Sequence, residues 1–376
     1  MPAASAPPSP PGLRLEDVLS LRELEELAES NLDRMAWDYY RSGSWDESTL
    51  RRNVAAWAER AIFHRVMVDV STRQCATTIL GLPSSFPLWI APTAMQRLCC
   101  PDGESATARA ASRIGVPMVL SSLSTQTVEE VTAAAAGVSG VPAAPILMQI
   151  YVAQDRDFTR SLVARAEAAG CAGFVLTVDT PAWGVRERDV HNHFHVPPGL
   201  RIANLERPGV PTGHQGRGIG ESLGWTIDPS LSWKDLERLA SWTSRPVLVK
   251  GVCRPDDALQ ALDHGAAGVI VSNHGGRQLD GAPATAESLE PVALAVAGRA
   301  PVLVDGGIRR GADVLRAVAL GASAVLVGRP LLWGLAAAGE AGAFRALEIL
   351  RNEFDLTMAL AGCPSLSAVT RDLLAP

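Results

Sequence analysis

The stretch that decides the fold is AEAAGCAGFVLTVD, residues 166–179, because its pattern returns twice along the chain. The same order of a helical end, a glycine and a short apolar run stands in ALDHGAAGVIVSN at 261–273 and in AVALGASAVLVGRP at 317–330. A glycine at this place adopts the left-handed conformation that ends a helix. An apolar run without alternation is typical of a strand buried on both faces of a parallel sheet. Each stretch therefore predicts a helix end, a tight turn and a buried strand.

Working outward, the chain contains eight apolar runs of this kind, separated mostly by helical stretches. Four of them follow a glycine that ends a helix, at Gly115, Gly170, Gly265 and Gly321. Eight parallel strands that alternate with helices close into a TIM (β/α)8 barrel more readily than they form an open sheet. We therefore predict an α/β protein with one TIM-barrel domain, whose strands are Leu88–Ala94, Met118–Ser122, Ile146–Tyr151, Phe174–Asp179, Val247–Gly251, Val269–Asn273, Val302–Asp305 and Val325–Gly328.

Three segments stand apart from this repeat. Residues 1–14 are rich in Pro and Ala and predict a disordered tail, which leaves 15–374 as the barrel domain. Ser20-Leu-Arg-Glu23 predicts a capping box that opens a helix through about Met35. The fourth and fifth strands are separated by far more residues than a normal connection needs, so 187–232 predicts an extended loop. A lid is its natural role, and a disordered insertion without function is the alternative.

The composition excludes several classes of protein. The chain has 376 residues, 20% of them charged, and a net charge of −6, so nothing favours nucleic-acid binding. No apolar run is long enough to span a bilayer. Six cysteines lack metal-ligand spacing, and no metal is predicted. The chain opens without a secretory signal, which predicts an intracellular protein, and its end, Leu-Leu-Ala-Pro, lacks the Ser-Lys-Leu peroxisomal address.

Polar or small residues stand at the carboxyl end of all eight predicted strands. Barrel enzymes place their active sites at that end. One such residue can be a satisfied core group, but eight at the same rim indicate a lined cavity. They are Ala91–Ala94, Ser121 and Ser122, Gln149 and Tyr151, Thr177 and Asp179, Lys250, Ser272–His274, Asp305–Gly307, and Gly328 with Arg329.

The last two strand ends have features of a phosphate site. Asp305-Gly-Gly-Ile-Arg-Arg-Gly311 leads into a helix, and Gly328-Arg-Pro330 does so after the final strand. Glycines let backbone N–H groups approach an anion, helix N-termini attract it, and arginine binds phosphate with two parallel hydrogen bonds. Barrel enzymes commonly hold phosphate at these two loops. The pair predicts a phosphorylated cofactor or substrate.

The run Ser272-Asn-His-Gly-Gly-Arg-Gln-Leu-Asp280 predicts a base beside an anion site. The imidazole of His274 suits proton abstraction, and the guanidinium of Arg277 suits a substrate carboxylate. After the fourth strand, Asp179 can orient His274, and Arg186 can supply a second clamp. Arg188 is expected at the surface, paired with Glu187 or Asp189.

Two features allow more than one interpretation on local grounds. Lys250 lies at the end of a buried strand, where an ammonium group needs an anion. It can be a Schiff-base nucleophile, as in barrel aldolases, or a charge stabiliser for a cofactor. Tyr39 and Tyr40 follow the first helix and can be hydrophobic filling or part of the site.

These motifs resemble the FMN-dependent 2-hydroxy acid oxidase family, which includes glycolate oxidase and long-chain hydroxy acid oxidase. The resemblance extends from about Leu15 to Leu374. The strings that match the family are Asp38-Tyr-Tyr-x-Ser-Gly43, Ile90-Ala-Pro-Thr-Ala-Met95, Leu176-Thr-Val-Asp-Thr-Pro181, Leu248-Val-Lys-Gly251, Ser272–Asp280, Asp305–Gly311 and Gly328–Pro330.

The resemblance implies a role for each matching residue. His274 is the implied base, with Asp179 as its partner and Tyr151 at the reacting hydroxyl. Arg186, Arg277 and Tyr39 bind the substrate carboxylate, and Lys250 stabilises the reduced flavin, which argues against Schiff-base chemistry. FMN is the implied cofactor, bound by Lys250 together with Pro92, Thr93, Ala94, Ser121, Gln149, Thr177, Ser272, Asp305, Gly306, Gly307, Ile308, Arg309, Gly328 and Arg329.

One departure bears on the substrate. Plant glycolate oxidase has Trp where this chain has Leu123, and a smaller side chain widens the pocket. We therefore expect medium or long-chain L-2-hydroxy acids, with a place in fatty acid metabolism, in preference to glycolate. Trp183 can refill that space.

The resemblance also bears on partners. It implies dioxygen as acceptor, with hydrogen peroxide as product, a homo-oligomer (a tetramer), and a peroxisome despite the missing address, with the cytoplasm as the alternative. A glycolate or lactate oxidase, a dehydrogenase with another acceptor, a Lys250 aldolase and a non-catalytic flavin-binding barrel are the competing hypotheses.

Overall fold

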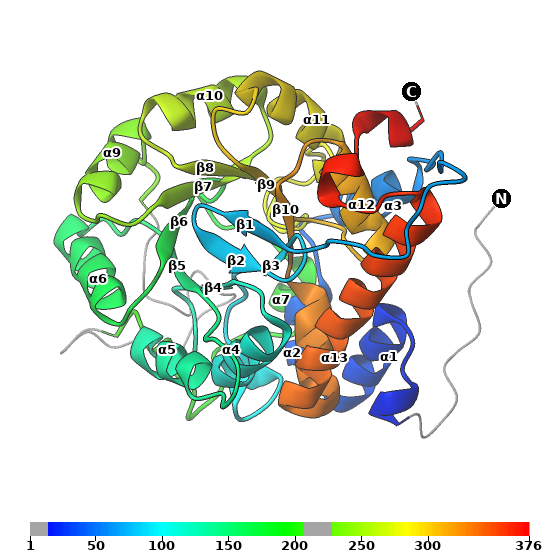
Figure 1. The fold of residues 1–376 in the computed structure, drawn as a ribbon. Coiled ribbons are helices and arrows are strands. Elements are labelled where there is room, and N and C mark those ends of the chain that lie inside the picture. The colour runs from blue at the N-terminus through cyan, green and yellow to red at the C-terminus, as the bar shows by residue number, and fades with distance from the viewer. Residues whose placement is uncertain (1–13, 207–227, 376) are drawn as a thin grey trace.

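A closed barrel of eight parallel strands forms the centre of the protein (Figure 1). The structure is a computed structural model that describes residues 14–206 and 228–375. The strands follow one another around the barrel in chain order, and β10 closes it against β3. They are β3 (Leu88–Ile90), β4 (Met118–Leu120), β5 (Ile146–Ile150), β6 (Gly173–Thr177), β7 (Val247–Val252), β8 (Gly268–Val271), β9 (Val302–Val304) and β10 (Ala324–Val327).

Helices surround the barrel, one or more after each strand, as Figure 1 shows. The predicted TIM barrel and all eight predicted strands are confirmed. The four glycines expected to end helices all have positive φ, from 79° at Gly115 to 99° at Gly321. The helices of the repeat are α4 (Gly103–Ile114), α5 (Val128–Ala136), α6 (Arg156–Ala168), α7 (Glu187–His191), α9 (Trp233–Ser241), α10 (Pro255–Asp263), α11 (Thr285–Val296), α12 (Gly311–Ala319) and α13 (Arg329–Ala361).

A short hairpin that the sequence analysis did not predict packs against the barrel interior. Its strands are β1 (Thr77–Ile79) and β2 (Leu82–Ser84), joined through a turn at Leu80 and Gly81, both with positive φ. Ile79 packs against the apolar side chains inside the barrel. These are Trp89, Ala91, Val119, Leu147, Val175, Leu248, Ile270, Leu303, Ala324 and Leu326, a core separate from the one between strands and helices.

The predicted first helix is in fact two helices. The capping box is confirmed, since Ser20 Oγ accepts from Glu23 N at 3.3 Å and the Glu23 carboxylate accepts from Ser20 N at 3.0 Å. The extent through Met35 was wrong, because α1 (Leu21–Asn31) ends early and Asp33 caps a second helix, α2 (Arg34–Arg41), by accepting from Ala36 N. The change of direction lets α2 carry Tyr39 and Tyr40 to the cavity described below. Helix α3 (Ser48–Ala58) follows.

The long connection after β6 begins as packed structure. It contains α7, and Ala203 N then donates to Ser124 O at 3.0 Å. Asn204 is fully buried, and its Oδ1 accepts from Val128 N at the start of α5. The first part of the predicted extended loop is thus fixed to the barrel. Residues 207–227 of the predicted loop and residues 1–13 of the predicted tail lie outside the described residues.

The remaining elements are single turns of 3-10 helix. They lie at Leu15–Asp17, Gln96–Leu98, Leu366–Ala368 and Arg371–Leu373. Within residues 14–206 and 228–375, no helix is both long and apolar enough to cross a bilayer.

Candidate active site

A layer of polar side chains lies directly above the apolar layer inside the barrel. Alternate residues of a strand face the same side, so the residues two positions after the apolar layer also face inward. Within five strands or directly after them these residues are polar and buried, and four of them line one cavity at the carboxyl end of the barrel. They are Ser121, Gln149, Thr177 and Lys250, which line the cavity, and Ser272, which contacts Lys250; Asp305, directly after β9, completes the layer.

Gln149 connects neighbouring strands within this polar layer. Its Oε1 accepts from Ser122 N at 3.1 Å, and its Nε2 donates to Thr177 Oγ1 at 3.1 Å. The side chain of Gln149 is 1% exposed, so these hydrogen bonds are protected from water. The amide is therefore held in one orientation at the cavity floor.

Lys250 is held as an ammonium ion. Its Nζ donates to Ser272 Oγ at 3.0 Å and lies 3.3 Å from Asp305 Oδ2. Burial alone would lower the pKa of Lys250, but the carboxylates of Asp305 and Asp179 outweigh it and raise that pKa. A protonated amine is not a nucleophile, so this geometry favours the charge-stabilising role over Schiff-base formation. Asp305 Oδ1 is buried and has no hydrogen-bond partner among the described residues, which leaves an acceptor for a ligand hydroxyl.

His274 and Asp179 form the predicted pair. The two residues follow β8 and β6, and His274 Nδ1 lies 3.0 Å from Asp179 Oδ1. His274 has a φ of 58°, a left-handed conformation that directs its ring from the loop toward Asp179. The opposite ring nitrogen, Nε2, lies 3.5 Å from the Tyr151 hydroxyl. Nε2 is therefore the nitrogen that can exchange a proton with a molecule in the cavity.

The pKa shifts of this pair agree with a base that is neutral at pH 7. Burial lowers the pKa of His274 from 6.5, Lys250 lowers it further, and Asp179 opposes the shift. Burial would raise the pKa of Asp179, but His274 and Lys250 reverse that effect and lower it. Asp179 is then ionised and can stabilise a proton gained by His274.

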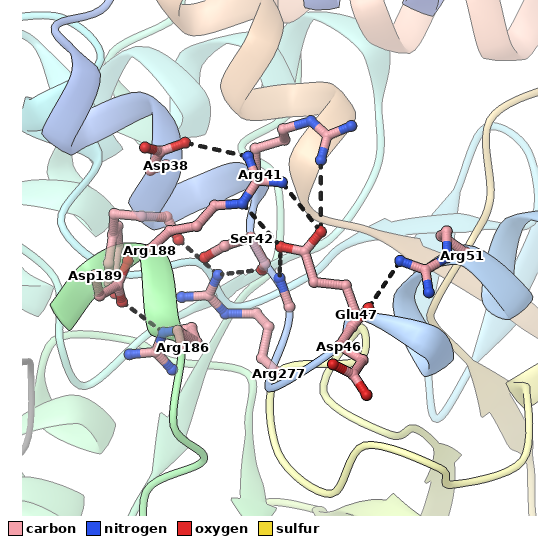
Figure 2. Close-up of polar contacts among 12 residues, drawn as sticks. Asp38, Arg41, Ser42, Asp46, Glu47, Arg51, Arg186, Arg188, Asp189 and Arg277 are labelled. Atoms are coloured by element: carbon pink, nitrogen blue, oxygen red, sulfur yellow. Dashed lines mark hydrogen bonds and ion pairs between the residues drawn. The ribbon is translucent and has the colours of Figure 1, made fainter. Parts of the chain in front are cut away.

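Two guanidinium groups meet at Tyr39. Arg277 lies 5.0 Å and Arg186 lies 5.7 Å from the centre of its ring, while Phe194 stacks on Tyr39 with ring centres 4.3 Å apart. Arg277 donates to Tyr39 O at 2.6 Å. Arg186 Nε donates to Asp189 Oδ2 at 2.6 Å (Figure 2). Burial, followed by the nearby Arg186, lowers the pKa of Arg277. Both arginines and Tyr39 line the cavity, so an anion bound there would relieve the repulsion between them.

Two sequence interpretations near this cluster change. Arg188 was expected to pair with Glu187 or Asp189, and this was wrong. It reaches Asp38 at 3.4 Å and Glu47 at 3.2 Å, because α7 lies against α2 (Figure 2). The sequence left open whether Tyr39 and Tyr40 are hydrophobic filling or part of the site. Both line the cavity, and the Tyr40 hydroxyl donates to Met95 O at 2.6 Å.

The predicted phosphate residues lie at one end of the cavity. Gly306, Gly307, Ile308, Arg309, Gly328 and Arg329 all line it, as do Pro92, Thr93 and Ala94. Arg329 donates to the carbonyl oxygens of Tyr40, Gly275 and Ser42, and the Arg309 guanidinium lies 4.8 Å from the Trp333 ring. Burial lowers the pKa of both arginines. Such a pair favours a dianionic group between the two side chains.

Packing also explains why position 307 is a glycine, which the sequence did not reveal. Its φ is 81°, and a Cβ atom there would lie 1.9 Å from the carbonyl oxygen of Asn53 in α3. Asn53 in turn exchanges side-chain hydrogen bonds of 2.8 Å with Asn273. The close contact with α3 therefore holds the loops after β8 and β9 together.

Gln278 is a positioning residue to which sequence reasoning gave no role. Its Nε2 donates to Asp179 O at 3.0 Å, and its Oε1 accepts from Gly184 N at 3.1 Å. It thereby ties the loop that carries Asp179 to the loop that carries His274. Its place in the Ser272–Asp280 run was the available signal.

Comparisons with known proteins agree with this geometry. Residues 28–376 match the model of the FMN-dependent dehydrogenase family. The chain belongs to that family. It is 48% identical to glycolate oxidase 3 of Arabidopsis thaliana over 94% of this chain and 95% of that protein. It is 47% identical to glycolate oxidase of Spinacia oleracea over 96% of each chain. A structure of mandelate oxidase with benzoyl-formic acid has a TM-score of 0.85 and 40% identity, covering 95% of this chain and 98% of the other.

The family relationship fixes the class of the protein and its cofactor. It is an FMN-dependent enzyme of the 2-hydroxy acid oxidase family, which removes the aldolase and the non-catalytic barrel as alternatives. The residues present fit FMN. The buried Asp305 Oδ1 without a partner suits a hydroxyl of the cofactor, and the buried pair Arg309 and Arg329 suits its phosphate.

Proposed function

We propose that this protein oxidises an L-2-hydroxy acid to the 2-oxo acid, with FMN reoxidised by dioxygen to give hydrogen peroxide. The proposal rests on one observation: a base and an anion site line the same cavity. The His274–Asp179 pair supplies a base, and Arg186 and Arg277 supply an anion site beside it. A 2-hydroxy acid carries both matching groups, a hydroxyl proton for the base and a carboxylate on the neighbouring carbon for the two arginines.

The proposed binding residues divide the cavity between cofactor and substrate. Asp305 would hold a hydroxyl of FMN, and Arg309 and Arg329 its phosphate. The flavin ring would lie among the residues of the polar layer and the loop after β3. The full set proposed for the cofactor is Pro92, Thr93, Ala94, Ser121, Gln149, Thr177, Lys250, Ser272, Asp305, Gly306, Gly307, Ile308, Arg309, Gly328 and Arg329.

The chain's own residues would orient the substrate and move one proton. Arg186, Arg277 and Tyr39 bind the carboxylate, and Tyr151 contacts the hydroxyl. His274 Nε2 accepts the hydroxyl proton, while Asp179 stabilises the resulting imidazolium through Nδ1. FMN, when bound, would accept the electron pair together with the C2 hydrogen, as a hydride equivalent, which leaves the 2-oxo group.

Lys250 would act through charge alone. Its ammonium lies at the cavity floor, between Ser272 and Asp305. A fixed positive charge in a buried site stabilises negative charge that develops during the reaction. Its pKa, raised by Asp305 and Asp179, keeps that charge in place at neutral pH.

For the substrate we favour a side chain larger than that of glycolate, of medium or long aliphatic type. Leu123 lines the cavity in the segment where plant glycolate oxidase has Trp. Trp183 occupies part of the same wall, with its ring centre 5.9 Å from that of Tyr151. The proposal therefore depends on how much space Leu123 leaves beyond Trp183.

The test is an anaerobic spectral titration of the purified protein. We expect a yellow protein whose visible flavin band is bleached by (S)-2-hydroxyoctanoate at lower concentration than by glycolate, with L-lactate and (S)-mandelate as further probes. Admission of air should restore the band and release one equivalent of hydrogen peroxide. Failure of all four acids to bleach the band would refute the proposed reaction, and a preference for glycolate would refute only the chain-length proposal.

The same preparation distinguishes the other outcomes. Fast bleaching with slow return in air would indicate a dehydrogenase with another acceptor. We further propose a homo-oligomer, a tetramer, in the peroxisome or the cytoplasm, which mass measurement in solution and fractionation of cells can check.

A further inference from the structure

A second hollow lies beside the cavity and is lined by arginines. It has a volume of about 690 Å³, large enough to admit a hydrated phosphate group. We call it the arginine hollow. Five of its arginines come from different segments of the chain. They are Arg22 in α1, Arg41 in α2, Arg51 in α3, Arg188 in α7 and Arg310 directly before α12.

The arginine hollow shares a wall with the proposed phosphate site. Arg309 and Arg329 line both the hollow and the cavity. An anion held in the hollow is therefore adjacent to the two guanidinium groups proposed to bind the phosphate of FMN. The arginine hollow therefore lies between solvent-facing arginines and these two guanidinium groups.

Arg41 and Arg51 are less closely paired with carboxylates than Arg188 and Arg310 are. Arg188 contacts Asp38 and Glu47, and Arg310 pairs with Glu353 at 2.6 Å. By contrast, Arg51 donates to the main-chain oxygen of Asp46 at 2.8 Å (Figure 2).

The contact of Arg41 is longer than a hydrogen bond. Its Nη1 lies 3.8 Å from Glu47 Oε2, and Arg188 shares that carboxylate (Figure 2). Glu25 and Glu47 are the carboxylates of the lining, so its positive groups outnumber its negative ones. This balance differs from that of the whole chain, whose net charge is −6.

The side chains of Arg41 and Arg51 are both open to solvent. The side chain of Arg41 is 40% exposed, and Arg51 is exposed. The phosphate of FMN is an anion that must approach a protein with negative net charge. A concave positive surface raises the local concentration of such an anion and its rate of association.

We propose that Arg41 and Arg51 capture the phosphate end of FMN from solvent and pass it to Arg309 and Arg329. This inference rests on the proposed phosphate site. It assigns Arg41 and Arg51 to the binding of the cofactor, with an effect on the rate at which FMN associates and none on the oxidation of the substrate.

The test measures the association of flavin with the full-length protein after its flavin has been removed. Quenching of flavin fluorescence on rapid mixing gives the rate constant for FMN and for riboflavin, which lacks the phosphate. In Arg41→Gln/Arg51→Gln we expect about a tenfold slower association of FMN at low ionic strength. The riboflavin rate should stay within twofold. At about 0.5 M salt the FMN difference should disappear, because exposed charges are screened.

A matched control removes two arginines from the other end of the barrel. Arg245 and Arg299 lie in helix-to-strand connections, and each side chain is 49% exposed. Arg245→Gln/Arg299→Gln changes the net charge equally and should leave the association of FMN unchanged. The single variant Arg51→Gln should give an intermediate rate.

Three results would overturn the proposal: an unchanged FMN rate in the double variant, an equal loss for riboflavin, or an equal loss in the control. A second measurement tests the phosphate site itself. It compares the equilibrium affinity of Arg329→Gln for FMN with its affinity for riboflavin. If the phosphate site is correct, Arg329→Gln weakens FMN binding and spares riboflavin. If that variant spares both, the phosphate site is wrong.

Discussion

The two inward-facing layers of the barrel use the same strands for opposite purposes. In β5, Leu147 lies in the apolar layer and Gln149, two residues on, lies in the polar layer. β6, β7 and β8 repeat the change with Val175 and Thr177, Leu248 and Lys250, and Ile270 and Ser272.

Both layers are buried, so exposure does not explain the difference between them. The apolar layer fills space with side chains that pack against each other and against the hairpin. The polar layer is satisfied partly by itself and leaves groups such as Asp305 Oδ1 without a partner among the described residues. Since buried polar groups are costly without partners, the polar layer is adapted to a ligand, and the apolar layer to the fold.

The largest expected effect comes from exchanging the character of the layers within β5. Leu147→Gln places an amide where the surroundings offer no hydrogen bond, and we expect it to lower the free energy of unfolding by about 3 kcal/mol. Gln149→Leu removes hydrogen bonds to Ser122 and Thr177 and should cost about 1 kcal/mol. Denaturant titration of both proteins without flavin measures the two values.

The same pair should show the opposite order in cofactor binding. Gln149→Leu should lower the affinity for FMN more than Leu147→Gln does, when the affinity of Leu147→Gln is measured on its folded molecules. Equal losses of stability in the two variants would contradict the division of the barrel into a structural and a ligand-binding layer.

The next effect concerns pH. Because the pKa of His274 lies below 6.5, its imidazole is neutral at pH 7, and kcat/KM should fall only as the pH drops through that lowered value. Asp179→Asn removes the influence that raises this pKa, so the acid limb should move to lower pH.

The maximum rate of Asp179→Asn should also fall. Loss of the charged hydrogen bond to the imidazolium costs about 2 kcal/mol, which is about 30-fold in rate. Flavin reduction measured from pH 4.5 to 9 checks both changes. An acid limb that moves to higher pH would show that Asp179 does not act on His274 as described.

The smallest effect concerns substrate size. Leu123→Trp should reduce kcat/KM for 2-hydroxyoctanoate relative to glycolate by about tenfold, or about 1.4 kcal/mol, the scale for one misfitting group in an apolar pocket. Leu123→Met keeps the volume nearly constant and is the control. An unchanged ratio for Leu123→Trp would mean that Trp183 already sets the size of the pocket.

Much of the fold was predictable because its information is local. Each buried strand contains a short apolar run, and four of the helix-to-strand turns carry a glycine with positive φ, at Gly115, Gly170, Gly265 and Gly321. The end of the first helix was missed because Asp33 was not recognised as the cap of a second helix. The hairpin was missed because its three-residue strands, one of them containing Pro83, are too short for a periodic pattern.

The residues that line the candidate cavity were largely predictable from the sequence, but many of their contacts were not. His274 and Asp179 stand at strand ends that a barrel brings together, so their contact followed from the fold. The contacts of Arg188 did not follow in this way, because Asp38 on α2 and Glu47 beyond it lie 150 and 141 residues earlier in the chain. The contact of Gly307 with α3 also depends on packing between distant segments.

The most direct test of the central claim is the rate of anaerobic flavin reduction in rapid mixing, compared between the unaltered protein and His274→Ala. The claim is that the polar layer holds FMN and that His274 removes the substrate proton. We therefore predict that His274→Ala remains yellow, with FMN bound, and reduces flavin with an L-2-hydroxy acid more slowly by several orders of magnitude. A rate within about tenfold of the unaltered protein, with full flavin content, would contradict the account.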